Sequence, residues 1–310
     1  MATLDAGGLT GRRFTPLPQP IKSMSSATPH FLVLGANGYL GKSLADFLAP
    51  RGSLILNHRS GNGECDGDLA DPATWTLFPS KCNTLFLAAG QAGHAPTLPI
   101  KTYVRNNIQV AMQLRDYLEK AEVDQLVILS TASVYRRGVS EIFEEGDLQP
   151  GDHYALSRLM ADQVLHALPE RTATAILRLS YPYGPGQTNR LIPLMARRIS
   201  NGEEINLENE AGRPRIRPLY IDDFLEAMGK LVKEKPKGIF NLGGRETVSI
   251  KELTKAIAFC LQKENRFRTG SLPPADILVN SEKLYRALDW EPSTPLKTGL
   301  QKTLQCMELA

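Results

Sequence analysis

A glycine-rich turn between an apolar run and a helical stretch constrains this fold more than any other feature of the sequence. The run at residues 30–34 (HFLVL) leads into Gly35-Ala36-Asn37-Gly38-Tyr39-Leu40-Gly41, and a helical pattern then continues to residue 49. Gly35 would permit a tight turn, Gly38 would let a pyrophosphate approach the backbone, and Gly41 would let the helix pack closely on the strand. The helix N-terminus adds N–H donors and positive potential. The turn therefore predicts a dinucleotide site, with cofactor contacts expected at Gly35, Asn37, Gly38, Tyr39, Leu40 and Gly41.

Apolar strands alternate with helices over the next 140 residues. Strands are expected at 53–56, 84–88, 126–130 and 173–179, and helices at 103–120 and 154–168. Continuous apolar strands separated by helices are typical of a parallel sheet that is covered on both faces. The predicted fold class is therefore α/β, a doubly wound parallel sheet of the Rossmann type.

After residue 182 the regular alternation of apolar strands and helices ends. A helix at 191–200, a strand at 204–207 and helices at 223–234 and 250–263 indicate a smaller C-terminal α/β substrate-binding lobe. The expected organisation is a disordered N-terminal tail (1–28), a dinucleotide-binding domain (29–180) and a mainly substrate-binding lobe (181–310). From that lobe the chain is expected to return in part to the first domain.

Composition excludes several classes of protein. The chain has 310 residues, with 36 basic against 33 acidic side chains and a net charge of +3. This balance disfavours a nucleic-acid binder or a membrane-surface binder. No apolar run approaches the ~18 residues that a membrane helix needs. Four scattered cysteines without a C-x-x-C pair predict reduced thiols, no metal site and a cytoplasmic location.

The end of the second strand bears on the choice between NAD and NADP. The stretch Leu56-Asn57-His58-Arg59-Ser60 holds no acid for the adenosine ribose hydroxyls. A base at this place accommodates a 2′-phosphate, so Arg59 favours NADP over NAD, unless it is simply a solvated loop arginine. Asp68 and Leu69 follow closely enough to contact the adenine edge, unless Asp68 is simply a surface carboxylate.

An ordered set of further motifs resembles the extended short-chain dehydrogenases, the NAD-dependent epimerase/dehydratase family, which acts mainly on nucleotide sugars. The resemblance runs from about residue 30 to 300. Its motifs are Gly35 to Gly41, Asp68-Leu69, Leu87-Ala88-Ala89, Asn106-Asn107, Thr131, Tyr154, Arg178 with 183–186 (YGPG), 220–223 (YIDD) and 240–244 (FNLGG).

The resemblance implies a role for each matching residue. Tyr154 would be the catalytic acid/base, Thr131 would hold the substrate oxygen, and Arg158 stands where the family has a lysine. A tyrosine, with an ordinary pKa of ~10, needs such a cation to act as a base near pH 7. The cofactor site would also include Ala88, Ala89, Asn107, Tyr154 and Arg158, and the substrate site Thr131, Ser133, Tyr181, Arg215 and Arg217. Relatives often form homodimers, so a homodimer is expected.

Three departures from the family pattern bear on which reactions the chain could catalyse. Arg158 keeps the positive charge but has a longer, planar head, so catalysis is either altered or lost. Ala132 and Ser133 replace the acids that move protons in dehydratases, which disfavours dehydration. Tyr181 replaces an asparagine that lies near the diphosphate in relatives. Arg178 could be a ligand contact or a structural ion-pair partner.

The leading hypothesis is an NADP- or NAD-dependent enzyme that transfers hydride at a sugar carbon, with C4 favoured, of a nucleotide-linked sugar. It would act as a 4-ketoreductase or as an epimerase. One alternative is an NADPH-dependent reductase of a non-sugar carbonyl, such as a natural-product ketone. Another is a dinucleotide-binding sensor in which Arg158 marks a dead site.

Overall fold

The computed structural model describes residues 30–61, 63, 65–91, 93, 98–138, 141–166, 168, 171–272 and 275–307. The predicted N-terminal tail, residues 1–28, lies outside the described residues.

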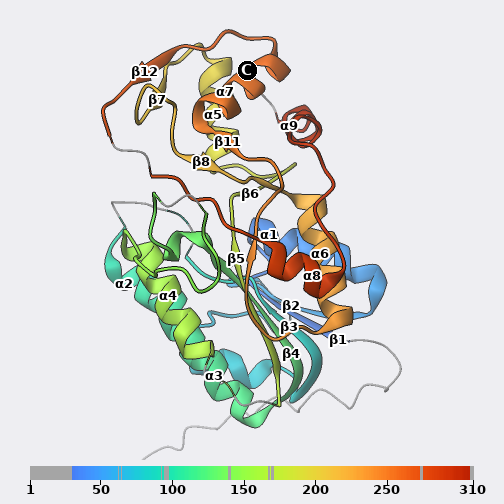
Figure 1. Cartoon of the computed structure of the whole chain (residues 1–310). Coiled ribbons are helices and arrows are strands. Elements are labelled where there is room, and N and C mark those ends of the chain that lie inside the picture. Colours follow the sequence, from blue (N-terminus) through green and yellow to red (C-terminus); the bar gives the residue numbers. More distant parts are fainter. Residues whose placement is uncertain are drawn as a thin grey trace, which may run out of the picture.

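Six parallel strands form the central sheet (Figure 1). Their order is β2-β1-β3-β4-β5-β10, which confirms the predicted doubly wound topology. After β1 the chain adds β2 on one side, and it then crosses over to add β3 on the other side. The order of strands therefore reverses at β1, and its carboxyl end is the switch point where such sheets bind ligands. The strands are β1 (His30–Leu34), β2 (Ser53–Asn57), β3 (Lys81–Leu87), β4 (Glu122–Thr131), β5 (Ala173–Leu179) and β10 (Gly238–Leu242).

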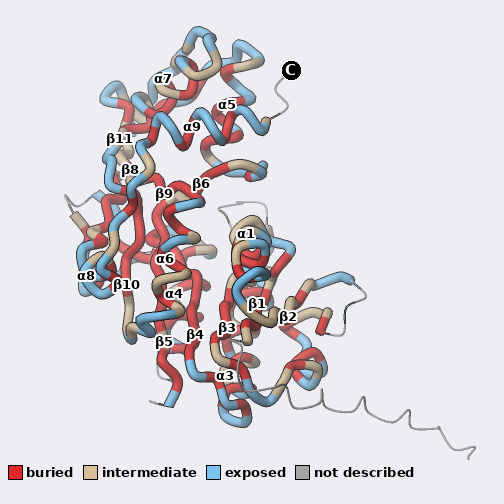
Figure 2. The backbone as a smooth tube through the Cα atoms, turned by 90° about the vertical axis from the view of Figure 1, so that its right-hand side faces the viewer, coloured by how far each residue is buried: buried red, intermediate tan, exposed pale blue. Residues whose placement is uncertain are grey.

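Helices cover both faces of the sheet, as the unbroken apolar strands predict. Phe31 and Val33 of β1 belong to one buried cluster, with α1 (Tyr39–Leu48) and α6 (Ile221–Glu234). The alternate residues of β1 belong to a second cluster, with α3 (Val110–Lys120) and α4 (His153–His166). The buried strands therefore lie between two helical layers (Figure 2).

A smaller lobe lies over the carboxyl ends of the strands (Figure 1). The chain enters it after β5 and leaves it to form β10, which pairs with β5 in the main sheet. Three two-stranded ribbons join β6 to β9, β7 to β12 and β8 to β11. The lobe and its connections comprise β6 (Pro182–Tyr183), α5 (Leu191–Ser200), β7 (Ile205–Leu207), β8 (Arg215–Ile216), β9 (Leu219–Tyr220), β11 (Val248–Ser249), α7 (Ile250–Leu261), β12 (Phe267–Thr269), α8 (Glu282–Leu288) and α9 (Leu296–Gln305).

The helix predicted over 103–120 is present but is not an α-helix throughout. The structure has α2 (Ile100–Tyr103), a π-helical turn (Val104–Gln109) and then α3. Within the π-turn, Asn106 and Asn107 are buried and bond to neighbouring loops. A π-turn adds a residue to the helix and is frequent at functional sites, which fits the place of these amides beside the switch point.

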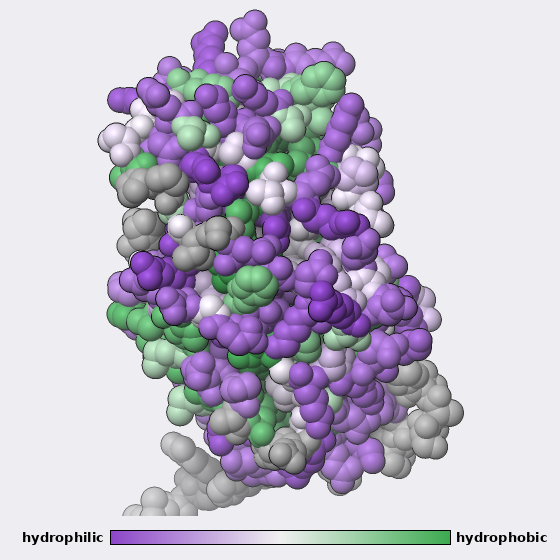
Figure 3. Space-filling model, viewed as in Figure 1, coloured by the Kyte–Doolittle hydropathy of each residue, from purple (hydrophilic) through white to green (hydrophobic). Residues whose placement is uncertain are grey.

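An apolar stripe is exposed on α2 to α4. Green atoms gather on the left-hand side of Figure 3, where α2 and α4 lie in Figure 1. The exposed apolar side chains of these helices are Ile100, Val104, Met112, Leu156 and Met160. Among the described residues, no helix is long and apolar enough to cross a bilayer.

Candidate active site

The glycine turn connects the ends of three strands. The Gly35 and Ala36 N–H groups donate to the Asn57 carbonyl at the end of β2, at 3.2 and 3.0 Å. On the other side, the Ala88 N–H donates to the Leu34 carbonyl at 3.0 Å, which ties the end of β3 to β1. The predicted cofactor residues Gly35 and Ala88 therefore meet at the switch point.

Two of the three glycines are required by the protein's own packing. Gly35 has a φ of +88°, and a Cβ there would lie 2.5 Å from the Ala89 Cα. A Cβ on Gly41 would lie 2.2 Å from the Gly35 carbonyl oxygen. Both approaches are closer than atoms can come, so any side chain would push the turn away from β3 or α1 from the turn.

Gly38 differs from its two neighbours. It is exposed, has an ordinary extended conformation (φ −72°, ψ 157°), and precedes the first turn of α1. The nearest atom to a Cβ there would be the Gly35 oxygen at 3.5 Å, an ordinary contact. Because packing does not require glycine at this position, the bare backbone beside a helix N-terminus fits a phosphate ligand. Asn37 is exposed beside it, whereas the Tyr39 and Leu40 side chains pack into the core.

Two arginines converge on one carboxylate near the end of β2. Arg59 Nη2 lies 3.7 Å from Asp68 Oδ1 and donates to Asn106 Oδ1 at 2.6 Å. Arg105 Nη2 lies 2.9 Å from Asp68 Oδ2. Burial acts to raise the pKa of Asp68, but the Ala70 N–H and the two arginines outweigh it and lower that pKa. Leu69 is buried next to it. Both arginines are more than half exposed, so their donors can reach a ligand.

Asn107 ties the loop after β3 to helix α4. Its Oδ1 accepts from the Gln91 N–H at 2.7 Å, and its Nδ2 donates to Ser157 Oγ at 2.8 Å. Ser157 Oγ in turn donates to the Tyr154 carbonyl. The predicted residue Asn107 thus positions the backbone around the site, and its amide is occupied by protein partners.

Thr131 is the last residue of β4 and is buried. Its Oγ1 accepts a hydrogen bond from the Ser133 N–H at 3.2 Å. Because the oxygen accepts this bond, the hydroxyl proton is available for another acceptor, such as a substrate oxygen. Ser133 therefore contributes its backbone to the orientation of Thr131, and its side chain is half-buried.

Tyr154 and Arg158 lie one turn apart on α4, which packs against β4. Tyr154 is half-buried, and its ring centre lies 6.5 Å from that of Tyr103. Arg158 is buried, and its Nη2 donates to the Leu129 carbonyl. Pairing of β4 with β3 ends at Ile128, so Leu129 is the first residue of β4 beyond that ladder. Arg158 therefore brings a cation beneath the end of the strand that carries Thr131.

Tyr181 follows β5 and has a left-handed backbone conformation, with a φ of 44°. This conformation is unusual for a bulky residue and costs of order 1–3 kcal/mol. Burial raises the pKa of the phenol, and the charged groups that act on it are Arg137 and Glu208. Tyr181 lies between the end of β5 and the start of β6, and its carbonyl accepts from the Leu219 N–H of the lobe at 3.2 Å.

The two predicted substrate arginines are engaged in ion pairs within the protein. Arg215 Nη2 lies 2.9 Å from Asp276 Oδ2, and Arg213 binds the same carboxylate. Arg217 Nη1 pairs with Glu141 Oε1 at 3.1 Å and donates to the Val279 carbonyl at 2.7 Å. These contacts give both side chains a structural role in the lobe.

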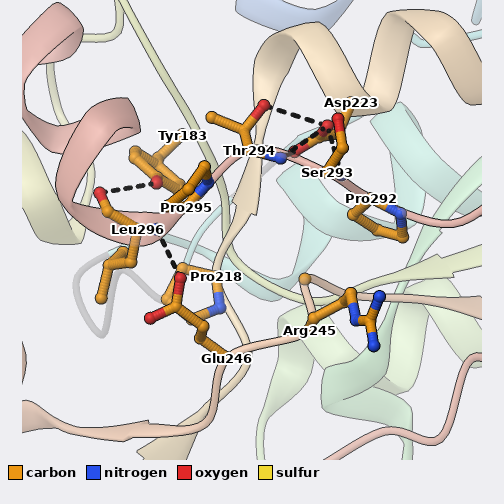
Figure 4. A pocket seen from close by; sticks show the side chains of 11 residues that line it. Tyr183, Pro218, Asp223, Arg245, Glu246, Pro292, Ser293, Thr294, Pro295 and Leu296 are labelled. Atoms are coloured by element: carbon orange, nitrogen blue, oxygen red, sulfur yellow. Dashed lines mark hydrogen bonds between the residues drawn. The ribbon is translucent and has the colours of Figure 1, made fainter.

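A cavity of about 210 Å³ lies at the start of α6 (Figure 4), and neither Tyr154 nor Thr131 lines it. Asp223 accepts from the Ser293 and Thr294 N–H groups, at 3.1 and 3.3 Å. Glu246 Oε1 accepts from the Leu296 N–H at 2.6 Å. Both carboxylates therefore bind the segment before α9 by hydrogen bonds, and the cavity lies between that segment and the start of α6.

Three participants were missed by sequence reasoning. Near the switch point, Arg105 pairs with Asp68 and Gln91 accepts from the Asn106 amide, and Asp162 lies one turn after Arg158 on α4. Only Asp162 left a signal, because its spacing of four residues from Arg158 places both on one helix face.

Comparison with known proteins gives this geometry a context. The model of the NAD dependent epimerase/dehydratase family matches residues 31–243. Protein CapI of Staphylococcus aureus is 26% identical over 321 residues, which cover 87% of this chain and 96% of CapI. The dTDP-4-dehydro-6-deoxyglucose reductase of Escherichia coli is 28% identical over 186 residues, which cover 57% of this chain and 58% of the reductase.

Solved structures are similar over almost the whole described chain. MoeE5 in complex with UDP-glucuronic acid and NAD has a TM-score of 0.80 at 20% identity, covering 90% of this chain and 98% of MoeE5. RMD from Pseudomonas aeruginosa, complexed with NADPH, has a TM-score of 0.77 at 21% identity, covering 90% and 98%. At these identities the likeness establishes the fold.

Proposed function

The chain belongs to the NAD dependent epimerase/dehydratase family, and on that premise we propose that it transfers hydride at C4 of a nucleotide-linked sugar, as a 4-ketoreductase or an epimerase. The observation that carries the proposal is the arrangement at the carboxyl ends of β1 and β4. A glycine turn suited to phosphates lies at the first, and Thr131 with its orienting bond lies at the second. Tyr154 and Arg158 stand on the helix packed against β4.

Each of these residues has a role in the proposed reaction. The nicotinamide ring, when bound, supplies or accepts the hydride. Tyr154 gives a proton to the sugar oxygen in reduction, or takes it in oxidation, and Thr131 donates a hydrogen bond that holds this oxygen. Arg158 supplies the positive charge that stabilises a phenolate. Ala132 and Ser133 offer no carboxylate for dehydration, which supports leaving that reaction out.

Native mass spectrometry of gently purified protein tests this function. Retained NAD or NADP in near-stoichiometric amount would support an epimerase, because an epimerase regenerates its cofactor in each cycle. An empty protein that binds added NADPH would support a reductase. A protein that binds neither cofactor would contradict the proposed function.

Cofactor preference can be tested at Arg59. We propose NADP(H), since Arg59 and Arg105 are exposed beside Asp68 and can donate to a 2′-phosphate. A charge-assisted bond contributes about 1.5–3 kcal/mol, so Arg59→Ala should weaken NADPH binding by about 10–100-fold. NADH affinity should change by less than about twofold. Fluorescence titration measures both, with Arg51→Ala as the control, and equal losses for the two cofactors would exclude the 2′-phosphate contact.

The exposed stripe on α2 to α4 supports a homodimer. Met112 and Met160 lie on adjacent packed helices and are each about half exposed, at 52% and 46%. A self-complementary contact would bury this face in both copies. Light scattering should give twice the chain mass of 34.1 kDa, and the pair Met112→Glu with Met160→Glu should give the monomer mass. Phe259→Glu, on the exposed surface of α7, is the control. A wild-type monomer would contradict the proposed assembly.

A further inference from the structure

The side chain of Arg59 joins the segments that follow the two neighbours of β1. Arg59 lies two residues after the end of β2, and its Nη2 donates to Asn106 Oδ1 at 2.6 Å. Asn106 lies in the π-turn of the helical segment after β3, and it contacts Gln91 in the loop at the end of that strand. Since β2 and β3 flank β1 in the sheet, this bond connects the two sides of the switch point, where doubly wound sheets bind dinucleotides.

The amide of Asn106 is oriented by the protein around it. Asn106 is 7% exposed, and its Nδ2 donates to Gln91 Oε1 at 3.4 Å. Gln91 is held in turn by Asn107, which accepts from the Gln91 N–H at 2.7 Å and donates to the Gln91 carbonyl at 3.3 Å. Because Nδ2 of Asn106 faces Gln91, its oxygen faces the Arg59 guanidinium as an acceptor. The buried asparagine therefore gives a fixed partner to an arginine whose side chain is 58% exposed.

The backbone directly before Arg59 is fixed as well. The His58 N–H donates to Asp66 Oδ1 at 2.8 Å, and the His58 carbonyl accepts from the Gly67 N–H at 2.9 Å. The N–H groups of Gly63 and His58 lower the pKa of Asp66, so this acceptor stays ionised at neutral pH. The chain is thus held where the Arg59 side chain begins, and Asn106 holds the other end of that side chain.

Asn106 holds the guanidinium without cancelling its charge. Among the described residues, the bond to Asn106 is the one hydrogen bond that the Arg59 side chain makes. The Asp68 carboxylate lies 3.7 Å from Arg59 Nη2 but only 2.9 Å from Arg105 Nη2. A guanidinium has five N–H donors, so four of those on Arg59 remain for a ligand. Two arginines and one carboxylate leave a net positive charge here, which suits a phosphate monoester.

We propose that Asn106 is a positioning residue that acts through Arg59 and determines the preference for NADP(H). Its neutral oxygen orders the guanidinium before the 2′-phosphate binds, so that less side-chain freedom is lost on binding. NAD(H) lacks this phosphate and gains nothing from the ordered donors. The inference on cofactor preference rests on the proposed function, whereas the ordering of the Arg59 side chain does not.

Fluorescence titration with NADPH and NADH tests the coupling. Asn106→Ala should weaken NADPH binding by about 3–10-fold, because the released guanidinium must then be ordered on binding, and should change NADH binding by less than about twofold. In the Arg59→Ala background the same substitution should change NADPH binding by less than about twofold. Gln109→Ala is the matched control, since Gln109 Nε2 donates from the same π-turn to the Ala70 carbonyl at 2.8 Å. This control should keep the wild-type ratio of NADPH to NADH affinity.

Two outcomes of the titrations would overturn the proposal. One is an equal loss of NADPH and NADH affinity in Asn106→Ala, which would identify Asn106 as a structural residue of the π-turn. The other is a loss of NADPH affinity that is as large in the Arg59→Ala background as in the wild type. If Asn106→Ala does not fold, Asn106→Leu takes its place in the same cycle, because leucine is close to asparagine in size and has no acceptor.

A second measurement needs neither cofactor nor turnover. In protein labelled with ¹⁵N-arginine, the Arg59 Nε–H signal is identified by its loss in Arg59→Lys, and its ¹⁵N relaxation gives an order parameter. We expect a value of at least about 0.6 in the cofactor-free wild type. In Asn106→Ala the value should fall to that of Arg197, an exposed arginine on α5 that serves as the mobile reference.

The two measurements separate the inference from the proposed function. An Arg59 order parameter that is the same in wild type and Asn106→Ala would overturn the inference, even in an active enzyme that prefers NADPH. An Arg59 side chain that is ordered by Asn106, in a protein that binds neither NADPH nor NADH, would uphold the ordered guanidinium and contradict the proposed function. The same ordering, in a protein whose NADPH affinity is unchanged by Arg59→Ala, would overturn the inference on cofactor preference.

Discussion

Tyr154→Phe should remove turnover while leaving cofactor binding intact. The phenylalanine keeps the ring that packs 6.5 Å from Tyr103 but lacks the hydroxyl that transfers the proton. A positioned acid or base contributes about 10²–10⁴-fold to a rate, so kcat should fall by that factor. NADPH oxidation with a 4-keto nucleotide sugar measures kcat, and fluorescence titration measures the NADPH dissociation constant. That constant should change by less than about twofold.

Tyr285→Phe provides the matched control for this prediction. Tyr285 lies on α8 and is half-buried, as Tyr154 is, and its hydroxyl donates to the Gly243 carbonyl at 2.7 Å, so its loss tests the removal of a half-buried phenol in general. Turnover by Tyr285→Phe should stay close to that of the wild type. An active Tyr154→Phe variant would mean that another group transfers the proton.

The second large effect is expected in the glycine turn, where two neighbouring glycines should respond in opposite ways. In Gly41→Ala the new methyl group would lie 2.2 Å from the Gly35 oxygen, so α1 must move off the turn. Overpacking of this kind costs about 1–3 kcal/mol, which for a chain of this length corresponds to a Tm lowered by about 2–5 °C. The thermal melt of the cofactor-free protein measures this loss.

Gly38→Ala should leave the same melt unchanged, because its methyl group fits without contact closer than 3.5 Å. It should instead weaken NADPH and NADH alike by at least about tenfold, since the methyl group would occupy the approach of the pyrophosphate. Equal lowering of Tm in both variants would identify Gly38 as a structural glycine. If Gly38→Ala binds both cofactors as the wild type does, this turn does not bind the pyrophosphate.

The fold could be predicted from the sequence because its strands are apolar on both faces. Phe31 and Val33 pack on one side of β1 and their neighbours on the other, which leaves a parallel sheet between helices as the arrangement that buries them all. The π-turn could not be predicted. It depends on bonds that Asn106 and Asn107 make with Arg59 and Gln91, and these residues come together only in the folded chain.

The candidate site was predictable where a motif fixes the backbone and not where charges meet across elements. Gly35 was predicted from its place between a strand and a helix, whereas the roles of Thr131 and Tyr154 came from the resemblance to the family and stay predictions. Arg215 and Arg217 were expected to bind substrate, but their partners Asp276 and Glu141 lie more than 60 residues away in the chain. Sequence spacing carries no information on such pairs. The role of both arginines in binding substrate stays a prediction.

The path of the chain through the lobe also affects how the sheet folds during synthesis on the ribosome. Strand β5 ends at Leu179, but its outer neighbour β10 begins only at Gly238, after α5 to α6 have been synthesised. A nascent chain therefore carries an unpaired strand edge while residues 180–237 leave the ribosome. Such edges recruit other chains, and distant pairings form late. Truncations that end within the lobe should accordingly aggregate, whereas the same sheet closed by β10 has that edge covered.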